Sequence, residues 1–190
     1  MSDEQIRASW LKYTMRCARR QPGDTPKLVA RAAGDALVRE IREAPALAWL
    51  PGVKFIEVCT SLRDALGVDG ARAFWNQSLH DAIDQTLIRP LAWGGLQLFG
   101  RTPAALYRRT PQAWALVTRN MGEMKAEPTK DERSLVLAVE GLPPRCRELT
   151  LLHMWEGGFV GQARFVEEKA VVETDARELP MGRARFSIRW

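Results

Sequence analysis

Apolar residues recur at helical spacing through the first two-thirds of the chain. The first stripe, within residues 3–20, is formed by Ile6, Trp10, Tyr13 and Cys17. Separations of four, three and four residues place these side chains on one face of an amphipathic helix. Three further stripes predict helices that end before Pro45, at Gly67 and before Pro90. Each helix has an apolar face to cover, so we expect a packed multi-helix part over residues 1–122.

A polar residue followed by proline marks three predicted helix starts. The side-chain oxygen can cap the helix, and proline is tolerated in the first turn. The pattern occurs at 24–26, 102–103 and 110–111. The last two predict two consecutive short helices, or one kinked helix, ending at Gly122. Between them and the earlier helices lies the apolar run 91–100, which a glycine pair interrupts; it is either a loose buried helix or a packed connector.

The hydrophobic period changes beyond residue 122. Leu135, Leu137 and Val139 alternate with their neighbours, as on a half-buried strand. Residues 146–156 predict one helix, and the glycines at 157, 158 and 161 a tight turn from this helix into a strand. The β-rich runs are 123–127, 133–140, 159–166, 170–174 and 183–190. We therefore expect an α/β (α+β) fold in a single domain, 1–190. Its N-terminal helices pack on a C-terminal antiparallel sheet of four or five strands, 123–190, with one inserted helix.

Composition places the chain among ordinary globular proteins. Hydrophobic residues make up 46% and charged residues 27% of the 190 positions. No apolar stretch is long enough for a membrane span, and the N-terminus carries acids where a signal peptide has a basic region. Three widely spaced cysteines fit reduced thiols, so we expect a cytoplasmic protein. The net charge of +5 has no concentrated basic stripe, and nucleic acid is not an expected partner.

The sequence carries no known catalytic or metal-binding motif. Phosphate loops, dinucleotide fingerprints, nucleophile elbows and zinc motifs are all absent. His80 and His153 are the only histidines, and each is interpreted as a partly buried structural residue rather than a ligand or a base. We therefore expect a protein that is not an enzyme, with no metal and no cofactor.

Seven tryptophans are many for this length, and large aromatics either fill a core or line a pocket for an apolar ligand. Most are assigned to the core. Trp93 is the strongest exception, because the adjacent glycine pair leaves room beside its ring. The predicted ligand-binding residues are Trp93, Phe99, Trp114 and Trp75.

Several segments resemble a known scaffold. They are 120–123, Leu142-Pro143-Pro144, Trp155 to Gly161 and the final Ala184 to Trp190. Their order is similar to that in the superfamily of 4-vinyl-reductase-type domains, transport-protein-particle (TRAPP) subunits and haem-nitric-oxide/oxygen-binding domains. The whole chain also resembles a myxobacterial paralogous family of unknown function. The matches to that family are Trp49-Leu50-Pro51, Phe99 to Pro103, Trp114 and Phe186 to Trp190.

Two departures narrow what the resemblance implies. The haem-binding relatives use a Tyr-x-Ser-x-Arg signature, which Tyr107-Arg108-Arg109-Thr110 does not supply. The 4-vinyl-reductase-type domains often carry cysteines in the final strands, and this chain has none after Cys146. The resemblance therefore implies a scaffold without haem or metal that binds small apolar molecules or assembles with proteins.

Two functions remain open. The favoured one is a non-enzymatic sensory or regulatory module that binds a small apolar ligand, self-associates as a homodimer, or does both. The alternative is a structural or protein-interaction protein that acts through an exposed surface patch.

Overall fold

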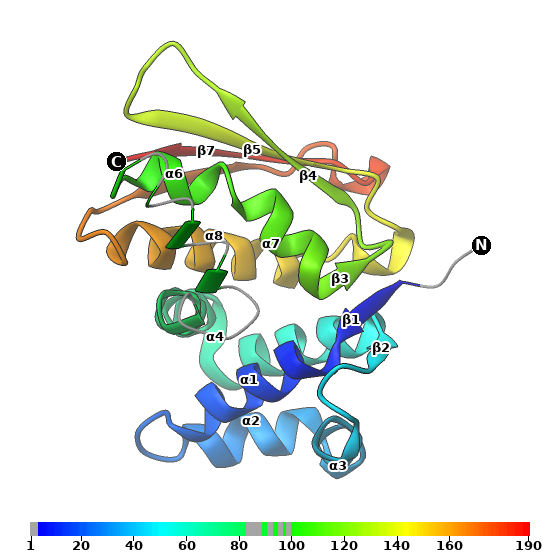
Figure 1. The fold of residues 1–190 in the computed structure, drawn as a ribbon. Helices are drawn as coiled ribbons and strands as arrows, with labels where there is room; N and C mark the ends of the chain where they lie inside the picture. The colour runs from blue at the N-terminus through cyan, green and yellow to red at the C-terminus, as the bar shows by residue number, and fades with distance from the viewer. Residues whose placement is uncertain (1–3, 83–88, 91–92, 95–96, 98–99) are drawn as a thin grey trace.

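The computed structural model describes residues 4–82, 89–90, 93–94, 97 and 100–190. Its elements are stacked in layers (Figure 1). A four-stranded antiparallel sheet lies on one side of helix α8 (Leu149–Arg164), and the long helix α4 (Val53–Ala82) packs against the other side. The N-terminal helices lie beyond α4. This arrangement confirms the predicted α+β fold.

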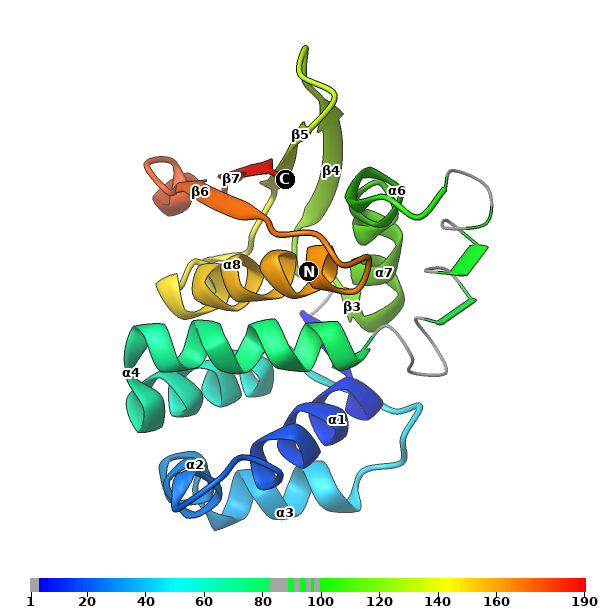
Figure 2. The ribbon, with the colours of Figure 1, turned by 90° about the vertical axis from the view of Figure 1, so that its left-hand side faces the viewer.

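Four helices form the N-terminal part. They are α1 (Ala8–Arg19), α2 (Thr25–Ala33), α3 (Asp35–Glu43) and α4. The second predicted stripe is divided between α2 and α3, because Gly34 adopts a φ of 75°. Gly67, with a φ of 72°, kinks α4 at the predicted helix end. Figure 2 shows α1, α2 and α3 at the end of the molecule farthest from the sheet.

A small three-stranded sheet joins distant segments, and the sequence did not predict it. Its strands are β1 (Gln5–Arg7), β2 (Trp49–Pro51) and β3 (Thr118–Arg119), in the order β2-β1-β3. The helix expected from residue 3 therefore begins only at Ala8. Ile6 pairs with Leu50 on one side and Thr118 on the other, and it is fully buried. Strands of two or three residues are too short to leave a periodic signal.

Two short helices follow the central segment. α6 (Pro103–Tyr107) begins after Thr102, whose hydroxyl accepts a hydrogen bond from the amide of Ala105 at 3.3 Å, as a cap does. In α7 (Thr110–Val117) the predicted cap is wrong: Thr110 is already helical, and its hydroxyl faces the Leu106 carbonyl. Because the two helices are separate, the expectation of consecutive short helices is confirmed. The predicted end at Gly122 is wrong, since α7 ends at Val117 and Thr118 and Arg119 form a strand. The predicted run 91–100 lies largely outside the described residues.

The larger sheet has the order β4-β5-β7-β6, and all its pairs are antiparallel. Its strands are β4 (Glu123–Pro128), β5 (Ser134–Glu140), β6 (Val171–Asp175) and β7 (Ala184–Arg189). The predicted alternation is confirmed, since Leu135, Leu137 and Val139 are all buried. Short 3-10 turns occur at Pro144–Cys146 and Leu179–Met181.

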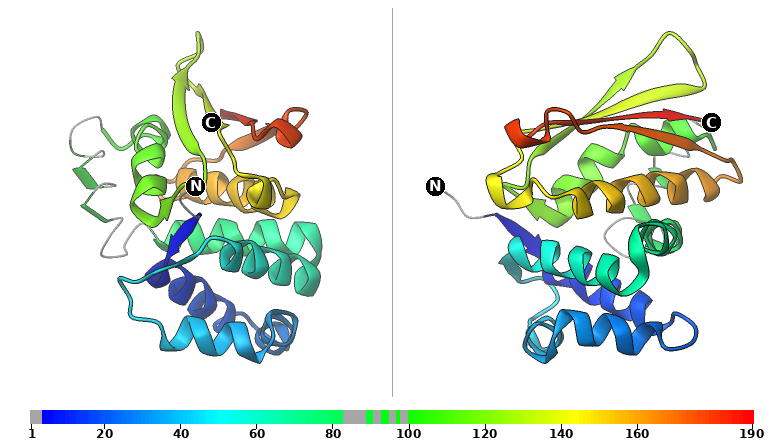
Figure 3. Two further views of the ribbon diagram at one scale, coloured as in Figure 1. Left: turned by 90° about the vertical axis from the view of Figure 1, so that its right-hand side faces the viewer. Right: turned by 180° about the vertical axis from the view of Figure 1, so that it is seen from behind.

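Helix α8 corrects one prediction. Residues 159–164 continue the helix instead of forming a strand, and the glycines at 157, 158 and 161 lie within it rather than in a turn. These glycines allow α8 to approach α4 closely: a β-carbon on Gly157 would lie 2.2 Å from the Arg72 carbonyl oxygen. Figure 3 shows the resulting layer, with α8 between α4 and the sheet. The glycines thus serve helix packing.

One large cluster of buried apolar side chains extends through both parts of the chain. It includes Ile6 of β1, Phe55 of α4, Trp155 of α8 and Ile188 of β7. The helical and sheet parts therefore share a core. Among the described residues, no helix combines the length and the apolar character that crossing a membrane requires.

Candidate functional site

A small apolar cavity lies where the N-terminal helices meet the sheet part. Its volume is about 80 Å³. Six elements contribute to its wall: α1, α4, α6, α7, β4 and α8. The lining residues are Trp10, Leu79, Ala82, Leu106, Arg109, Thr110, Ala113, Trp114, Val117, Met124, Met154, Trp155, Gly158, Phe159 and Gln162. Segments from residue 10 to residue 162 thus converge on one space.

Helix α8 supplies the densest part of the wall. Met154, Trp155 and Phe159 are all buried and lie within two turns of the helix. Gly158 has no side chain, and a β-carbon there would lie 2.9 Å from Cγ of Leu79. Because the glycines of α8 have no side chains, α4 lies close enough to α8 for Leu79 and Ala82 to reach the cavity.

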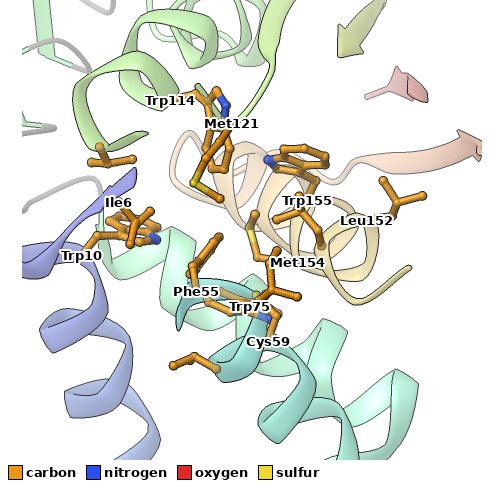
Figure 4. Close-up of a cluster of buried hydrophobic side chains, with 14 of the residues drawn as sticks. Ile6, Trp10, Phe55, Cys59, Trp75, Trp114, Met121, Leu152, Met154 and Trp155 are labelled. Atoms are coloured by element: carbon orange, nitrogen blue, oxygen red, sulfur yellow. The ribbon is translucent and has the colours of Figure 1, made fainter. Parts of the chain in front are cut away.

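Two tryptophans bring unpartnered donors to this wall. Trp10 is 8% exposed and Trp155 is 3% exposed. Neither Nε1 finds a hydrogen-bond partner among the described residues. Figure 4 shows the two rings on α1 and α8, with the Trp155 nitrogen on the side that faces Trp114. A buried N–H without a partner costs about 1–3 kcal/mol, so each such donor calls for an explanation.

Trp114 also lines the cavity, but its polar atom is satisfied. Its Nε1 donates a hydrogen bond to the Gly122 carbonyl at 3.3 Å. The ring packs edge-on against Trp155, with centroids 5.2 Å apart and an interplanar angle of 69°. All three tryptophans therefore shape the wall with their rings, and the Nε1 atoms of Trp10 and Trp155 are left without a partner among the described residues.

The other predicted ligand-binding residues lie elsewhere. Trp75 is 1% exposed and packs edge-on against Phe55 and Phe74 in the core, outside the cavity lining. Trp93 packs against Phe165 in a separate small apolar cluster. Phe99 lies outside the described residues. The structure therefore brings Trp114 to the cavity but not Trp75 or Trp93.

Sequence reasoning missed Trp10, Trp155, Phe159 and Gln162 as lining residues. The sequence predicts Trp10 on the apolar face of a helix and Phe159 in a strand. Both predictions give these residues a role in core packing and none in a cavity wall. A helical reading of residues 149–164 would have placed 155, 158, 159 and 162 along one face, because their spacing follows i, i+3, i+4 and i+7. That signal was present but was interrupted by the glycines.

The polar part of the lining comes from α7 and α8. The Thr110 hydroxyl lies 2.9 Å from Oε1 of Gln162 and donates to it. Arg109 is the lining residue that carries a charge, and its guanidinium donates to Gln112 at 2.9 Å. No carboxylate, histidine, cysteine or tyrosine belongs to the described lining. The described wall therefore offers hydrogen-bond donors and apolar contact but no general base.

Neither histidine belongs to the cavity. Nδ1 of His80 lies 2.9 Å from the Asp81 carboxylate on the partly exposed end of α4. His153 lies on α8, and burial lowers its pKa. Among the described residues, no group of three or more histidine, cysteine, aspartate and glutamate side chains is arranged to hold a metal ion.

The buried thiols and phenols are structural. Cys17, Cys59 and Cys146 are free and buried, and burial raises the pKa of the Cys146 thiol to about 12. The Tyr107 hydroxyl donates to the Phe159 carbonyl at 2.7 Å, and burial raises its pKa as well. A thiol whose pKa is raised by burial is a poor nucleophile and a poor metal ligand.

Comparison by sequence finds no match to a family model and none to a curated protein. Comparison by structure finds matches among solved proteins. An H-NOX protein variant from K. algicida, in the unliganded Fe(II) state, aligns with a TM-score of 0.65 at 10% identity, over 97% of this chain and 96% of that one. The fold is that of the H-NOX proteins.

Two further H-NOX comparisons agree. An H-NOX variant from T. tengcongensis aligns with a TM-score of 0.63 at 12% identity, over 97% of both chains. A structure from a study of haem redox potential and porphyrin distortion aligns with a TM-score of 0.61 at 12% identity, over 97% of this chain and all of that one. The H-NOX fold therefore spans nearly the whole chain, and the resemblance to that superfamily is confirmed for the fold.

Proposed function

We propose that this chain is a non-enzymatic sensory or regulatory module that binds a small neutral molecule in the cavity between α1, α4, α7 and α8. The observation that carries the proposal is the pair of buried indole donors, Trp10 and Trp155, which lack partners beside an apolar space. A ligand with an oxygen acceptor and a small apolar body would satisfy at least one donor and fill the space.

Haem does not fit the described cavity. Haem iron in proteins is held by histidine, cysteine, methionine or tyrosine. The lining offers two methionines, Met124 and Met154, and no histidine, cysteine or tyrosine. The volume of about 80 Å³ is also far too small for a porphyrin. The missing Tyr-x-Ser-x-Arg signature points the same way, and we propose a module without cofactor.

The same chemistry supports a binding module over an enzyme. Catalysis by proton transfer needs a titratable group within hydrogen-bond reach of the reacting atoms. A guanidinium group such as that of Arg109 does not act as a base in proteins, and the two histidines lie outside the described lining. The described site can therefore bind and orient a molecule but has no group to exchange a proton with it.

Three further expectations remain proposals. The three buried free thiols fit a reducing compartment, so we propose a cytoplasmic location. Exposed large apolar side chains such as Leu28, Leu116 and Val171 come from different elements, and single scattered residues do not mark a contact surface. Self-association and a protein partner therefore rank below ligand binding. The myxobacterial paralogous family remains the proposed sequence family.

Calorimetric titration with 2-butanone tests the proposal. The matched hydrocarbon 2-methyl-1-butene has the same shape but no acceptor. We expect the ketone to bind about two- to tenfold more tightly, since one hydrogen bond contributes about 0.5–1.5 kcal/mol. Trp155→Phe should remove most of this preference, whereas Trp93→Phe should keep it, because the Trp93 donor is also unpartnered but lies outside the cavity lining. Equal affinity for both probes would refute the proposed recognition.

A second measurement separates this proposal from haem binding. Haemin added to the purified protein should produce no stoichiometric haem absorbance band. A sharp one-to-one band that Trp155→Phe or Met154→Leu alters would contradict the cofactor-free interpretation.

A further inference from the structure

A second hollow lies at the opposite end of the molecule from the sheet. Helices α1, α2 and α3 border an open groove of about 320 Å³ there, within the range of ordinary ligand pockets. Figure 2 shows these three helices together, with α4 between them and α8. No residue of this groove lines the Trp10–Trp155 cavity. The groove is therefore independent of the proposed function.

The floor of the groove is apolar. Each of the three helices contributes side chains or backbone without charge to it. They are Met15 and Ala18 of α1, Pro26, Val29 and Ala30 of α2, and Val38 and Ile41 of α3. Met15, Ala18, Val29 and Ile41 are buried, so the floor belongs to the packed interior rather than to mobile surface side chains. An alkyl group placed here would leave water on a preformed apolar surface.

The rim of the groove is cationic. Lys12, Arg16, Arg19 and Arg42 belong to the lining, and no carboxylate does. Nζ of Lys12 donates to the Arg42 carbonyl at 2.9 Å, which holds its ammonium group between α1 and α3. Within the described part of the chain, neither Arg16 nor Arg19 has an ion pair at 4.0 Å or less. Arg42 is paired with Glu43, whose Oε1 lies 3.6 Å from Nη2 of the arginine. The positive charge of the rim that no described carboxylate neutralises therefore lies at Arg16 and Arg19.

We propose that this groove binds a single-chain aliphatic carboxylate, with its tail on the floor between α1, α2 and α3 and its carboxylate at Arg16 and Arg19. The charge complementarity and the apolar floor together define this class. A small inorganic anion would leave the floor unused, and a neutral hydrocarbon would leave the rim unpaired.

The volume of the groove, about 320 Å³, sets the length of the alkyl chain that it holds. The same space corresponds to roughly ten water-sized groups, each about 30 Å³, which matches an alkyl chain of medium length. Decanoate is therefore the appropriate probe.

Calorimetric titration of the full chain with decanoate, below its micelle concentration and at low salt, tests the proposal. Octanoate, which is two methylenes shorter, should bind about fifteenfold more weakly, because each buried methylene contributes about a fourfold change in affinity. Decanol, which has the same chain but no charge, should also bind at least tenfold more weakly. Equal binding of decanoate and decanol would overturn the role of the cationic rim.

Variants locate the binding to the groove. The double variant Arg16→Gln/Arg19→Gln should lose at least tenfold in decanoate affinity, and Ala30→Phe should block the floor without changing the charge. Arg20→Gln is the matched control, since Arg20 follows Arg19 on the chain, is exposed and does not line the groove. Equal losses in Arg20→Gln and the double variant, or unchanged binding in Ala30→Phe, would overturn the assignment. Trp155→Phe should leave decanoate binding unchanged.

Discussion

Replacing Gly161 by alanine should separate α4 and α8, two of the helices that contribute to the cavity wall. A β-carbon at this position would lie 2.1 Å from the Asn76 carbonyl oxygen and 3.0 Å from the amide nitrogen of His80, both on α4. Ordinary van der Waals contact begins at about 3.4 Å, so α4 and α8 would have to move apart by roughly 1 Å. Backbone atoms within a helix have no rotamer through which to relax.

Two opposing effects set the magnitude. Overpacking a close contact costs about 1–3 kcal/mol, occasionally more, and the severe approach to backbone places Gly161→Ala at the upper end. Alanine is favoured over glycine within a helix by about 1 kcal/mol. We therefore expect a net loss of about 2 kcal/mol in the free energy of unfolding. A loss of that size lowers the melting temperature of a 190-residue protein by about 4–8 °C.

Urea denaturation of Gly161→Ala and Gly158→Ala measures this effect. Gly158 lies on the same helix, and its substitution brings the same gain in helix propensity, but its β-carbon would meet only the Leu79 side chain, at 2.9 Å. A side chain can rotate away, so Gly158→Ala should change the free energy of unfolding by less than about 1 kcal/mol. If the two variants are equally stable, the close helix contact does not govern the packing of α4 on α8.

Three further predictions concern residues near the cavity. Tyr107→Phe should cost about 1 kcal/mol in urea denaturation because it removes the buried hydrogen bond to the Phe159 carbonyl, and an unchanged midpoint would contradict that contact. Trp155→Phe should stay within about 1 kcal/mol of the wild type in thermal melts, because losing ring volume is offset by losing an unpartnered donor; a loss above about 3 kcal/mol would indicate that the donor has a partner. Burial lowers the pKa of His153, so the folded protein binds fewer protons than the unfolded chain as the pH falls through the ordinary value of 6.5. Its melting temperature should therefore drop between about pH 7 and pH 5, and His153→Gln should flatten that slope, whereas parallel profiles would contradict the assignment.

Much of the fold can be predicted from local patterns in the sequence. The helical stripe at Trp10, Tyr13 and Cys17 and the alternation from Leu135 to Val139 depend on neighbours in the sequence, and both predictions are confirmed. The three-residue strand at Ile6 depends instead on partners at Leu50 and Thr118, which no local period records. That is why the first helix was predicted to begin too early.

The glycines of α8 and the donors of the cavity show the other limit. Glycine has low helix propensity, so Gly157 and Gly161 favoured a turn when read alone, whereas the contact with α4 makes them necessary inside a helix. Whether an indole N–H has a partner depends on the packing of six elements and cannot be read from spacing. The sequence predicts Trp114 as a site residue. It does not predict Trp10 and Trp155, because their part in the site depends on that packing.

The most direct test of the proposed ligand site is a titration of ¹⁵N-labelled protein with 2-butanone, observed through the indole N–H resonances and assigned with Trp→Phe variants. If the proposed site is correct, the Trp10 or Trp155 resonance, or both, should show saturable shifts. The Trp93 resonance should stay in place, and 2-methyl-1-butene should not reproduce the shifts. Unsaturable shifts shared by all the tryptophans, or identical shifts with the hydrocarbon, would contradict a site built on these two donors.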